Sequence, residues 1–152
     1  KMMQTAIGIL AGWIFTYIGA CFFHTIFVLK DLESIGAKIS IEIYLKTIIL
    51  NLYGLAFEGV SYASFILIGF LISMLSAVLT CKLLKILPWL IYALAGATSM
   101  ATILYIGSLN FFGYSFISSA QSTLGFGCQA LAGALGGIVF FSIYHRDGLN
   151  AG

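Results

Sequence analysis

Five polar side chains stand at or just inside the ends of long apolar runs, and they are the residues that could do chemistry. They are His24, Glu58, Asn110, Gln121 and Gln129. An imidazole near a carboxylate can relay a proton, and with amides or carbonyls it can bind a small polar solute or a cation. Polar groups inside a membrane are costly, so a functional pocket is the first hypothesis for them.

Each of these residues also has a plainer explanation. A single His near a helix end, such as His24, commonly hydrogen-bonds a backbone carbonyl or reaches the membrane interface. Glu58 suits a residue at the level of the lipid headgroups. Gln129 among glycines suits an interhelical hydrogen bond, which contributes only about 0.6 kcal/mol on average. The sequence leaves the pocket and these separate structural roles open.

Other site chemistries lack their residues. The cysteines form no CxxC pair; they are Cys21, Cys81 and Cys128. No HExxH, GxSxG or phosphate-binding glycine loop occurs, and Gly125-x-Gly127 lacks the strand and acidic residue of a dinucleotide site. His24 and His145 fall on opposite sides of the predicted membrane, so they cannot share a haem or a metal ion. We therefore predict no catalytic residue, no cofactor and no metal site.

The elements that hold these residues are predicted to be membrane-spanning helices. Hydrophobic residues make up 61% of the 152 residues and charged residues only 8%, against about 25% charged in an average soluble domain. This composition excludes a water-soluble globule, a disordered chain and a disulfide scaffold. We expect an all-α membrane protein that forms one integral domain over residues 1–152.

Four uncharged stretches are long enough to cross the hydrocarbon core, whose thickness of about 30 Å needs about 20 helical residues. They are Ala6–Leu29, Tyr62–Cys81, Pro88–Leu109 and Thr123–Tyr144. The connections between them are short and leave no room for a soluble catalytic domain. The sequence therefore predicts a bundle of four transmembrane helices.

The longer connection between the first and second spans contains one more helical pattern. Apolar residues recur at intervals of three and four over residues 41–56, and Ser40 stands at the N-cap position. The opposite face is predicted to carry the polar residues Glu42, Lys46, Thr47 and Asn51. We interpret this segment as an amphipathic helix lying in the membrane interface. The alternatives are a re-entrant hairpin or a fifth span over about 39–57, which the charged residues make costly.

Basic residues near the span ends predict the orientation, because cytoplasmic loops carry the excess of Lys and Arg. One side carries Lys1, Lys82, Lys85 and Arg146, and the other carries Lys30, Lys38 and Lys46 over longer loops. We therefore expect both termini in the cytoplasm, in a bacterial inner (plasma) membrane. Lys82 and Lys85 are candidates for contact with anionic lipid headgroups, whereas four basic residues are too few for a nucleic-acid surface.

Small residues recur on every span at the spacing that lets helices approach closely. The candidate packing residues are Gly8, Gly12, Gly125, Gly133 and Gly137. These seams can pack within the bundle or against another subunit. A shared Ala-Leu-Ala-Gly-Ala string at 93–97 and 130–134 is either an internal repeat, as in transporters, or a chance match.

Two functions follow from these patterns. The first is a non-catalytic membrane protein, a structural or accessory subunit that packs its small-residue seams against a partner or a second copy. The second is a small oligomeric permease or channel for a small solute or proton, with a polar pocket at His24, Gln129 and Glu58. The scarcity of polar groups within the spans favours the first. The expected partners are the lipid bilayer and another membrane subunit, and no nucleic acid.

Overall fold

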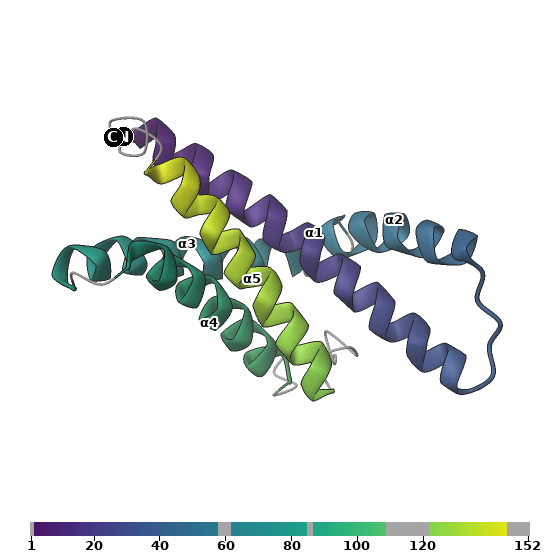
Figure 1. Ribbon diagram of the computed structural model, residues 1–152. Helices are drawn as coiled ribbons and strands as arrows, with labels where there is room; N and C mark the ends of the chain where they lie inside the picture. Colours follow the sequence, from purple (N-terminus) through teal and green to yellow (C-terminus); the bar gives the residue numbers. More distant parts are fainter. Residues whose placement is uncertain (1, 58–61, 85–86, 109–121, 146–152) are drawn as a thin grey trace.

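The computed structural model describes residues 2–57, 62–84, 87–108 and 122–145. Within these residues the chain is all helical and has no strand, which confirms that the protein is all-α. The helices, shown in Figure 1, are α1 (Met2–Ser34), α2 (Ile41–Phe57), α3 (Tyr62–Leu83), α4 (Pro88–Ser108) and α5 (Thr123–Tyr144).

Four of these helices, α1, α3, α4 and α5, are long and apolar enough to cross a membrane. The bounds of α3, α4 and α5 lie within two residues of the predicted spans, and α2 ends one residue after its prediction. Helix α1 is longer than its predicted span at both ends, because the polar residues that flank an apolar run do not break a helix. Its 33 residues correspond to about 50 Å of helix.

Helix α1 ends at a glycine that leaves the right-handed region. Gly36 has φ of 96°, and its N–H donates to the carbonyl of Glu33 at 3.0 Å while the N–H of Ala37 donates to Leu32 at 3.1 Å. This pair of bonds is a Schellman motif, in which the left-handed position favours glycine. The motif turns the chain back toward α2.

Helices α2 and α5 begin at serine caps. The hydroxyl of Ser40 accepts the N–H of Ile43 at 3.4 Å, as the sequence predicts. The hydroxyl of Ser122 accepts the N–H of Gly125 at 3.0 Å and starts α5. Each cap satisfies a backbone donor that a helix leaves unpaired in its first turn.

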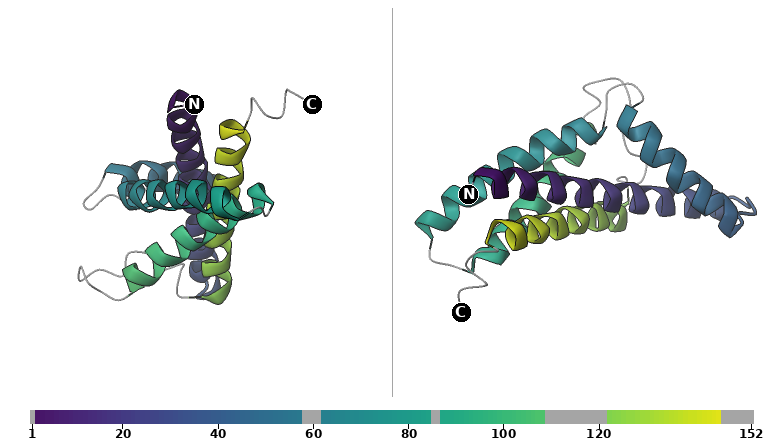
Figure 2. Two further views of the ribbon diagram at one scale, coloured as in Figure 1. Left: turned by 90° about the vertical axis from the view of Figure 1, so that its left-hand side faces the viewer. Right: turned by 90° about the horizontal axis from the view of Figure 1, so that it is seen from above.

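The four long helices form a ring in which each touches two neighbours. Helix α5 packs against α1 and α4, and α3 packs against α4 and, less closely, α1. Figure 1 shows α5 alongside α1, and Figure 2 shows α3 and α4 crossing that pair obliquely. The ring is filled by large side chains that are almost fully buried, among them Ile66, Phe70, Met74, Tyr92 and Phe140.

Helix α2 stands apart from this ring. None of its residues is buried, and its close neighbours are α1 and the start of α3. The sequence places Asn51 on the outer polar face of this helix, and that prediction is wrong. The Asn51 amide faces α1 and donates to the Thr25 hydroxyl at 2.9 Å, because a polar side chain on the facing helix offers it a partner.

Candidate functional site

Helix α5 presents glycines to α4. Gly133 lies against the backbone of Gly96, and a Cβ built on either glycine would overlap the carbonyl oxygen of the other. One turn further along, a Cβ on Gly137 would overlap the carbonyl of Tyr92. The two helices therefore meet backbone to backbone, which is how small residues bring membrane helices together.

A neighbouring stripe of α5 does the same toward α1. A Cβ on Gly136 would overlap the Thr16 hydroxyl, and a Cβ on Gly12 would lie 2.8 Å from the Gly136 carbonyl oxygen. One turn earlier on α1, a Cβ on Gly8 would lie 3.1 Å from the Phe140 ring. Space for a side chain is therefore missing along both faces of α5.

The structure describes all five glycines singled out for helix packing. Gly8, Gly12, Gly133 and Gly137 lie at the contacts just described, and Gly125 is buried at the start of α5. The glycine seams are thus occupied inside the bundle and offer no surface to another protein.

Gln129 is the one strongly polar side chain that is fully buried between described helices. Its Nε2 donates to the carbonyl of Ala20 at 3.0 Å and joins α5 to α1. Its Oε1 has no hydrogen-bond partner among the described residues. The Gln129 side chain therefore links α5 to α1 through its Nε2 and leaves its Oε1 buried in the interior.

The rest of the predicted polar pocket is only partly placed. His24 is half-buried on α1, one helical turn after Ala20, the residue that Gln129 contacts. Glu58, Asn110 and Gln121 lie outside the described residues. Of the two predicted headgroup contacts, Lys82 is exposed in the last turn of α3, and Lys85 lies outside the described residues.

A polar stripe along α1, which the sequence analysis missed, holds α2 and α3 in place. The stripe consists of Trp13, Tyr17, Cys21 and Thr25 at intervals of four. Tyr17 donates its hydroxyl to the carbonyl of Leu52 on α2 at 2.6 Å, and Trp13 donates its indole N–H to the carbonyl of Ala63 on α3 at 2.9 Å. The spacing of four residues within an apolar run is the sequence pattern that could have predicted this stripe.

The first turn of α2 also contacts the end of α1, where Tyr44 of α2 lies beside Glu33 of α1. Burial and the neighbouring Glu33 carboxylate together raise the pKa of Tyr44. Thr25, which accepts from Asn51, donates in turn to the carbonyl of Cys21 at 2.8 Å. Helix α2 is therefore tied to α1 from its beginning to its last turns.

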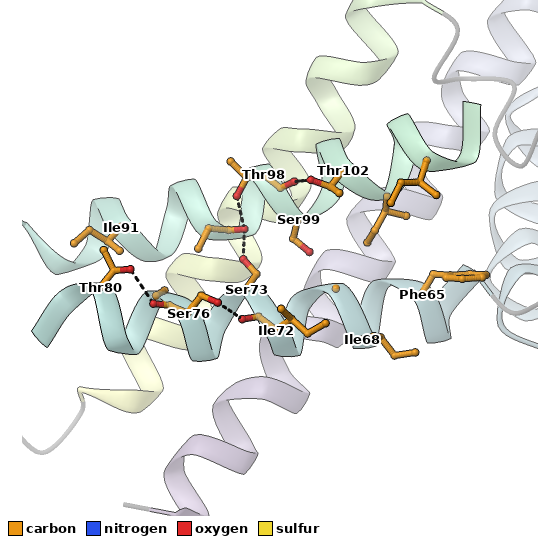
Figure 3. A pocket seen from close by; sticks show the side chains of 15 residues that line it. Phe65, Ile68, Ile72, Ser73, Ser76, Thr80, Ile91, Thr98, Ser99 and Thr102 are labelled. Carbon is orange, nitrogen blue, oxygen red and sulfur yellow. Dashed lines mark hydrogen bonds between the residues drawn. The ribbon is translucent and has the colours of Figure 1, made fainter. Parts of the chain in front are cut away.

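Helices α3 and α4 enclose a groove with a volume of about 540 Å³, which opens to the outside of the bundle. Apolar side chains such as Phe65, Ile72 and Ile106 line it, together with Gly69 and Ala95. The groove also contains hydroxyl side chains from both helices, namely Ser73, Ser76, Thr80, Thr98, Ser99 and Thr102 (Figure 3). We call it the α3–α4 groove.

Most of these hydroxyls donate to backbone carbonyls. Ser76 donates to Ile72 at 2.8 Å, and Thr102 donates to Thr98 at 2.8 Å, each one turn earlier on its own helix. Ser73 reaches across the groove and donates to the carbonyl of Ala95 on α4. These bonds satisfy the donors and leave lone pairs of the hydroxyl oxygens available as acceptors.

Ser99 is the exception among them. Its side chain is 8% exposed, and its Oγ has no hydrogen-bond partner among the described residues. Figure 3 shows this hydroxyl between the two helices, and a Cβ built on Gly69 would lie 3.0 Å from it. The contact between α3 and α4 therefore holds a buried hydroxyl that has no hydrogen-bond partner among the described residues.

No metal site is evident in residues 2–57, 62–84, 87–108 and 122–145, where no group of three His, Cys, Asp or Glu side chains comes together. The three cysteines are unpaired thiols, of which Cys21 is buried. The α3–α4 groove is a concave surface of the described chain lined by hydroxyl and apolar side chains. A comparison with protein-family models, curated proteins and solved structures found no match to this chain.

Proposed function

We propose that this chain is a non-catalytic membrane protein, an accessory subunit that binds another membrane protein through the α3–α4 groove. The observation that carries the proposal is the contrast between its small-residue surfaces. Gly12, Gly96, Gly133, Gly136 and Gly137 of α1, α4 and α5 are enclosed by neighbouring helices, whereas the small residues of the groove border a volume of about 540 Å³ that the described residues leave open. Small residues and hydroxyls are what helix interfaces in membranes use.

The hydroxyl side chains support this assignment. A helix face that meets only lipid gains nothing from Ser and Thr, and the exposed face of α3 away from the groove carries Leu71, Leu75 and Leu79 instead. In apolar surroundings a hydroxyl contributes most when it contacts another polar group. We therefore infer that the groove side of α3 and α4 meets protein.

We infer further that the protein lies in a bacterial inner membrane with both termini in the cytoplasm. The support is the distribution of basic residues around the spans. A fluorescent protein that folds only in the cytoplasm, fused after residue 152, should be bright. A dark fusion with an active periplasmic phosphatase at the same position would contradict this orientation.

For α2 we infer a re-entrant position in the outer half of the membrane. Tyr17, which holds Leu52, lies near the middle of the predicted span 6–29. Side chains in the second half of α2, such as Tyr53 at 64% and Phe57 at 74% exposed, need cover that lipid tails supply. A tryptophan in place of Tyr53 should be quenched most by lipids brominated deep in their tails, and strongest quenching by headgroup-level bromine would contradict the inference.

A second candidate function is a small permease, and one observation favours it. The Oε1 of Gln129 is buried and has no hydrogen-bond partner among the described residues, so a solute could donate to it, and its Nε2 bonds to Ala20, one helical turn before His24. Purified protein in liposomes should then show solute flux that Gln129→Leu abolishes. Flux that this change leaves intact would rule out the site.

Purification in a mild detergent tests the accessory function. We expect the wild-type chain to elute in a complex larger than itself, with a second membrane protein at fixed stoichiometry. Ser76→Leu should release that protein, because the added side chain fills the groove. The matched control is Ser142→Leu on α5, since Ser142 is also exposed and bonds back one turn, at 2.9 Å to Ile138. Elution of the wild-type chain alone as a monomer would contradict the proposal.

A further inference from the structure

Helix α2 covers part of α1 without being packed into the ring of four helices. None of its residues is buried, and its second half meets the middle of α1 (Figure 1). Three of its side chains, Leu52, Leu55 and Ala56, are only partly buried, against the cluster that contains Tyr17 and Cys21. Low burial and few tertiary contacts are typical of the elements that open most easily in a fold.

The surface beneath α2 is polar and enclosed. Cys21 is 0% exposed and lies one helical turn after Tyr17 and one turn before Thr25, two α1 side chains that bond to α2. Tyr62 of α3 belongs to the same cluster as Cys21, and its buried hydroxyl has no hydrogen-bond partner among the described residues. Helix α2 therefore closes one side of a group of hydroxyls and a thiol.

The hydrogen bonds between α2 and α1 are of the kind that contributes little between membrane helices. The Tyr17 hydroxyl donates to the Leu52 carbonyl at 2.6 Å, and the Asn51 amide donates to the Thr25 hydroxyl at 2.9 Å. Loss of one such bond changes an equilibrium constant about 3-fold on average. The apolar side chains of α2 lose little by leaving α1, because lipid tails are as apolar as the side chains they replace. The closed position of α2 is therefore favoured over an open one by a small margin in free energy.

The connection before α2 supplies a hinge. Residues 35–40 lie outside any helix, and Gly36 among them has φ of 96°. No described atom would lie within 4 Å of a Cβ on Gly36, so packing does not hold the turn at that position. Hinges are a few loop residues that absorb changes in φ and ψ. The contact of Tyr44 with Glu33 keeps the first turn of α2 beside this pivot.

We propose that α2 is a hinged cover, which swings away from α1 about residues 35–40 and admits water to Tyr17, Cys21 and Thr25. Polar groups within a membrane need hydrogen-bond partners, and water replaces those that α2 supplies in the closed position. The ring of four helices stays assembled during this movement, because the glycine contacts of α5 with α1 and α4 do not involve α2. The inference goes beyond the proposed accessory function and does not depend on it.

Cys21 reports the movement, because its thiol reacts with a maleimide as a thiolate, which needs contact with water. The full-length chain in phosphatidylcholine vesicles is treated with N-ethylmaleimide, and mass spectrometry follows each cysteine separately. We expect slow modification of Cys21 in the wild type and a rate about 3-fold higher in Asn51→Leu, which lacks one bond to α1. Cys81 and Cys128 are internal controls that should keep their rates. Tyr53→Phe, which alters an exposed ring on the same helix, should react like the wild type.

Two further measurements separate this movement from unfolding of the whole bundle. Gly133→Ala strains the contact between α4 and α5 and should leave the Cys21 rate unchanged, because α2 alone moves. Spin labels at Tyr53→Cys and Leu131→Cys, in a chain whose natural cysteines are replaced by Ala, should show a second, longer distance whose population grows in Asn51→Leu. A single distance, a Cys21 rate that Asn51→Leu leaves unchanged, or an equal rise of that rate in Gly133→Ala would each overturn the proposal.

Discussion

Two helix contacts in this protein use small residues with opposite results. Where α5 meets α4, Gly133 and Gly96 lie backbone to backbone and no side chain fits between them. Where α3 meets α4, Ser73 bonds to Ala95 and Ser99 lies over Gly69, and a volume of about 540 Å³ stays open beside them. The Cβ atoms and hydroxyls of the second contact hold the helices further apart than glycine does.

This difference separates two meanings of a small-residue pattern. A glycine pair lets two helix backbones come into direct contact, so neither glycine remains available to another protein. A serine or threonine row keeps the helices further apart and places polar atoms beside the contact. This sequence carries both patterns, and under the proposed function the first assembles its own bundle and the second binds a partner.

The largest effect is expected where the contact is closed. Gly133→Ala places a Cβ on the carbonyl of Gly96, and such overpacking should destabilise the bundle by about 3 kcal/mol or more. Unfolding in mixed micelles of dodecyl sulfate, followed by circular dichroism, measures the loss. Gly127→Ala is the control, because no described atom lies within 4 Å of a Cβ there. Equal stability of the two variants would mean that α4 and α5 do not meet at these glycines.

A smaller effect is expected at the polar stripe of α1. Tyr17→Phe and Asn51→Leu each remove one hydrogen bond to or from α2, worth about 0.6 kcal/mol on average between membrane helices. Together they should loosen α2 and leave the ring of four helices folded. Hydrogen exchange of α2 amides should rise several-fold in the double variant and not in Tyr53→Phe, which alters an exposed ring. Unchanged exchange in the double variant would contradict the view that this stripe holds α2 in place.

The fold was predictable because the bilayer imposes one length on every span. The runs 62–81 and 123–144 reappear as α3 and α5 with almost the same ends. The ends of α1 were not predictable from hydropathy, which stops at the first polar residues, whereas the helix continues to the left-handed Gly36. Hydropathy therefore predicts which residues lie in the hydrocarbon core, whereas the helix itself can extend beyond that core.

The candidate site was less predictable, because it depends on which helices meet. Periodicity predicts Asn51 on the outer face of its helix. It distinguishes an apolar face from a polar one but does not show that Thr25 of α1 lies opposite Asn51. The α3–α4 groove needs α3 beside α4 in one register, with Ser99 over Gly69. Neither residue is unusual in the sequence alone, so only the packed structure shows that the Ser99 hydroxyl has no partner among the described residues.

Gln129 belongs to the closed region but should behave unlike its glycines. Gln129→Leu removes the bond to Ala20 together with the buried Oε1, which has no partner among the described residues, and these two losses have opposite signs. We expect a change in unfolding free energy of less than about 1 kcal/mol, close to the scale of interhelical hydrogen bonds. The same micelle assay measures it, with Gly133→Ala as the reference. A loss as large as that of the reference would show that the amide supports more than one helix contact.

The smallest effect on stability is expected at the groove, although its effect on binding should be complete. Ser76→Leu adds a side chain to an exposed wall and removes only a bond to the carbonyl of its own helix, so the unfolding free energy should stay within about 0.5 kcal/mol of the wild type. The same variant should lose the partner protein in detergent, whereas Ser142→Leu keeps both stability and partner. Destabilisation of Ser76→Leu to the level of Gly133→Ala would mean that the groove is a closed contact, and the distinction between the two regions would then fail.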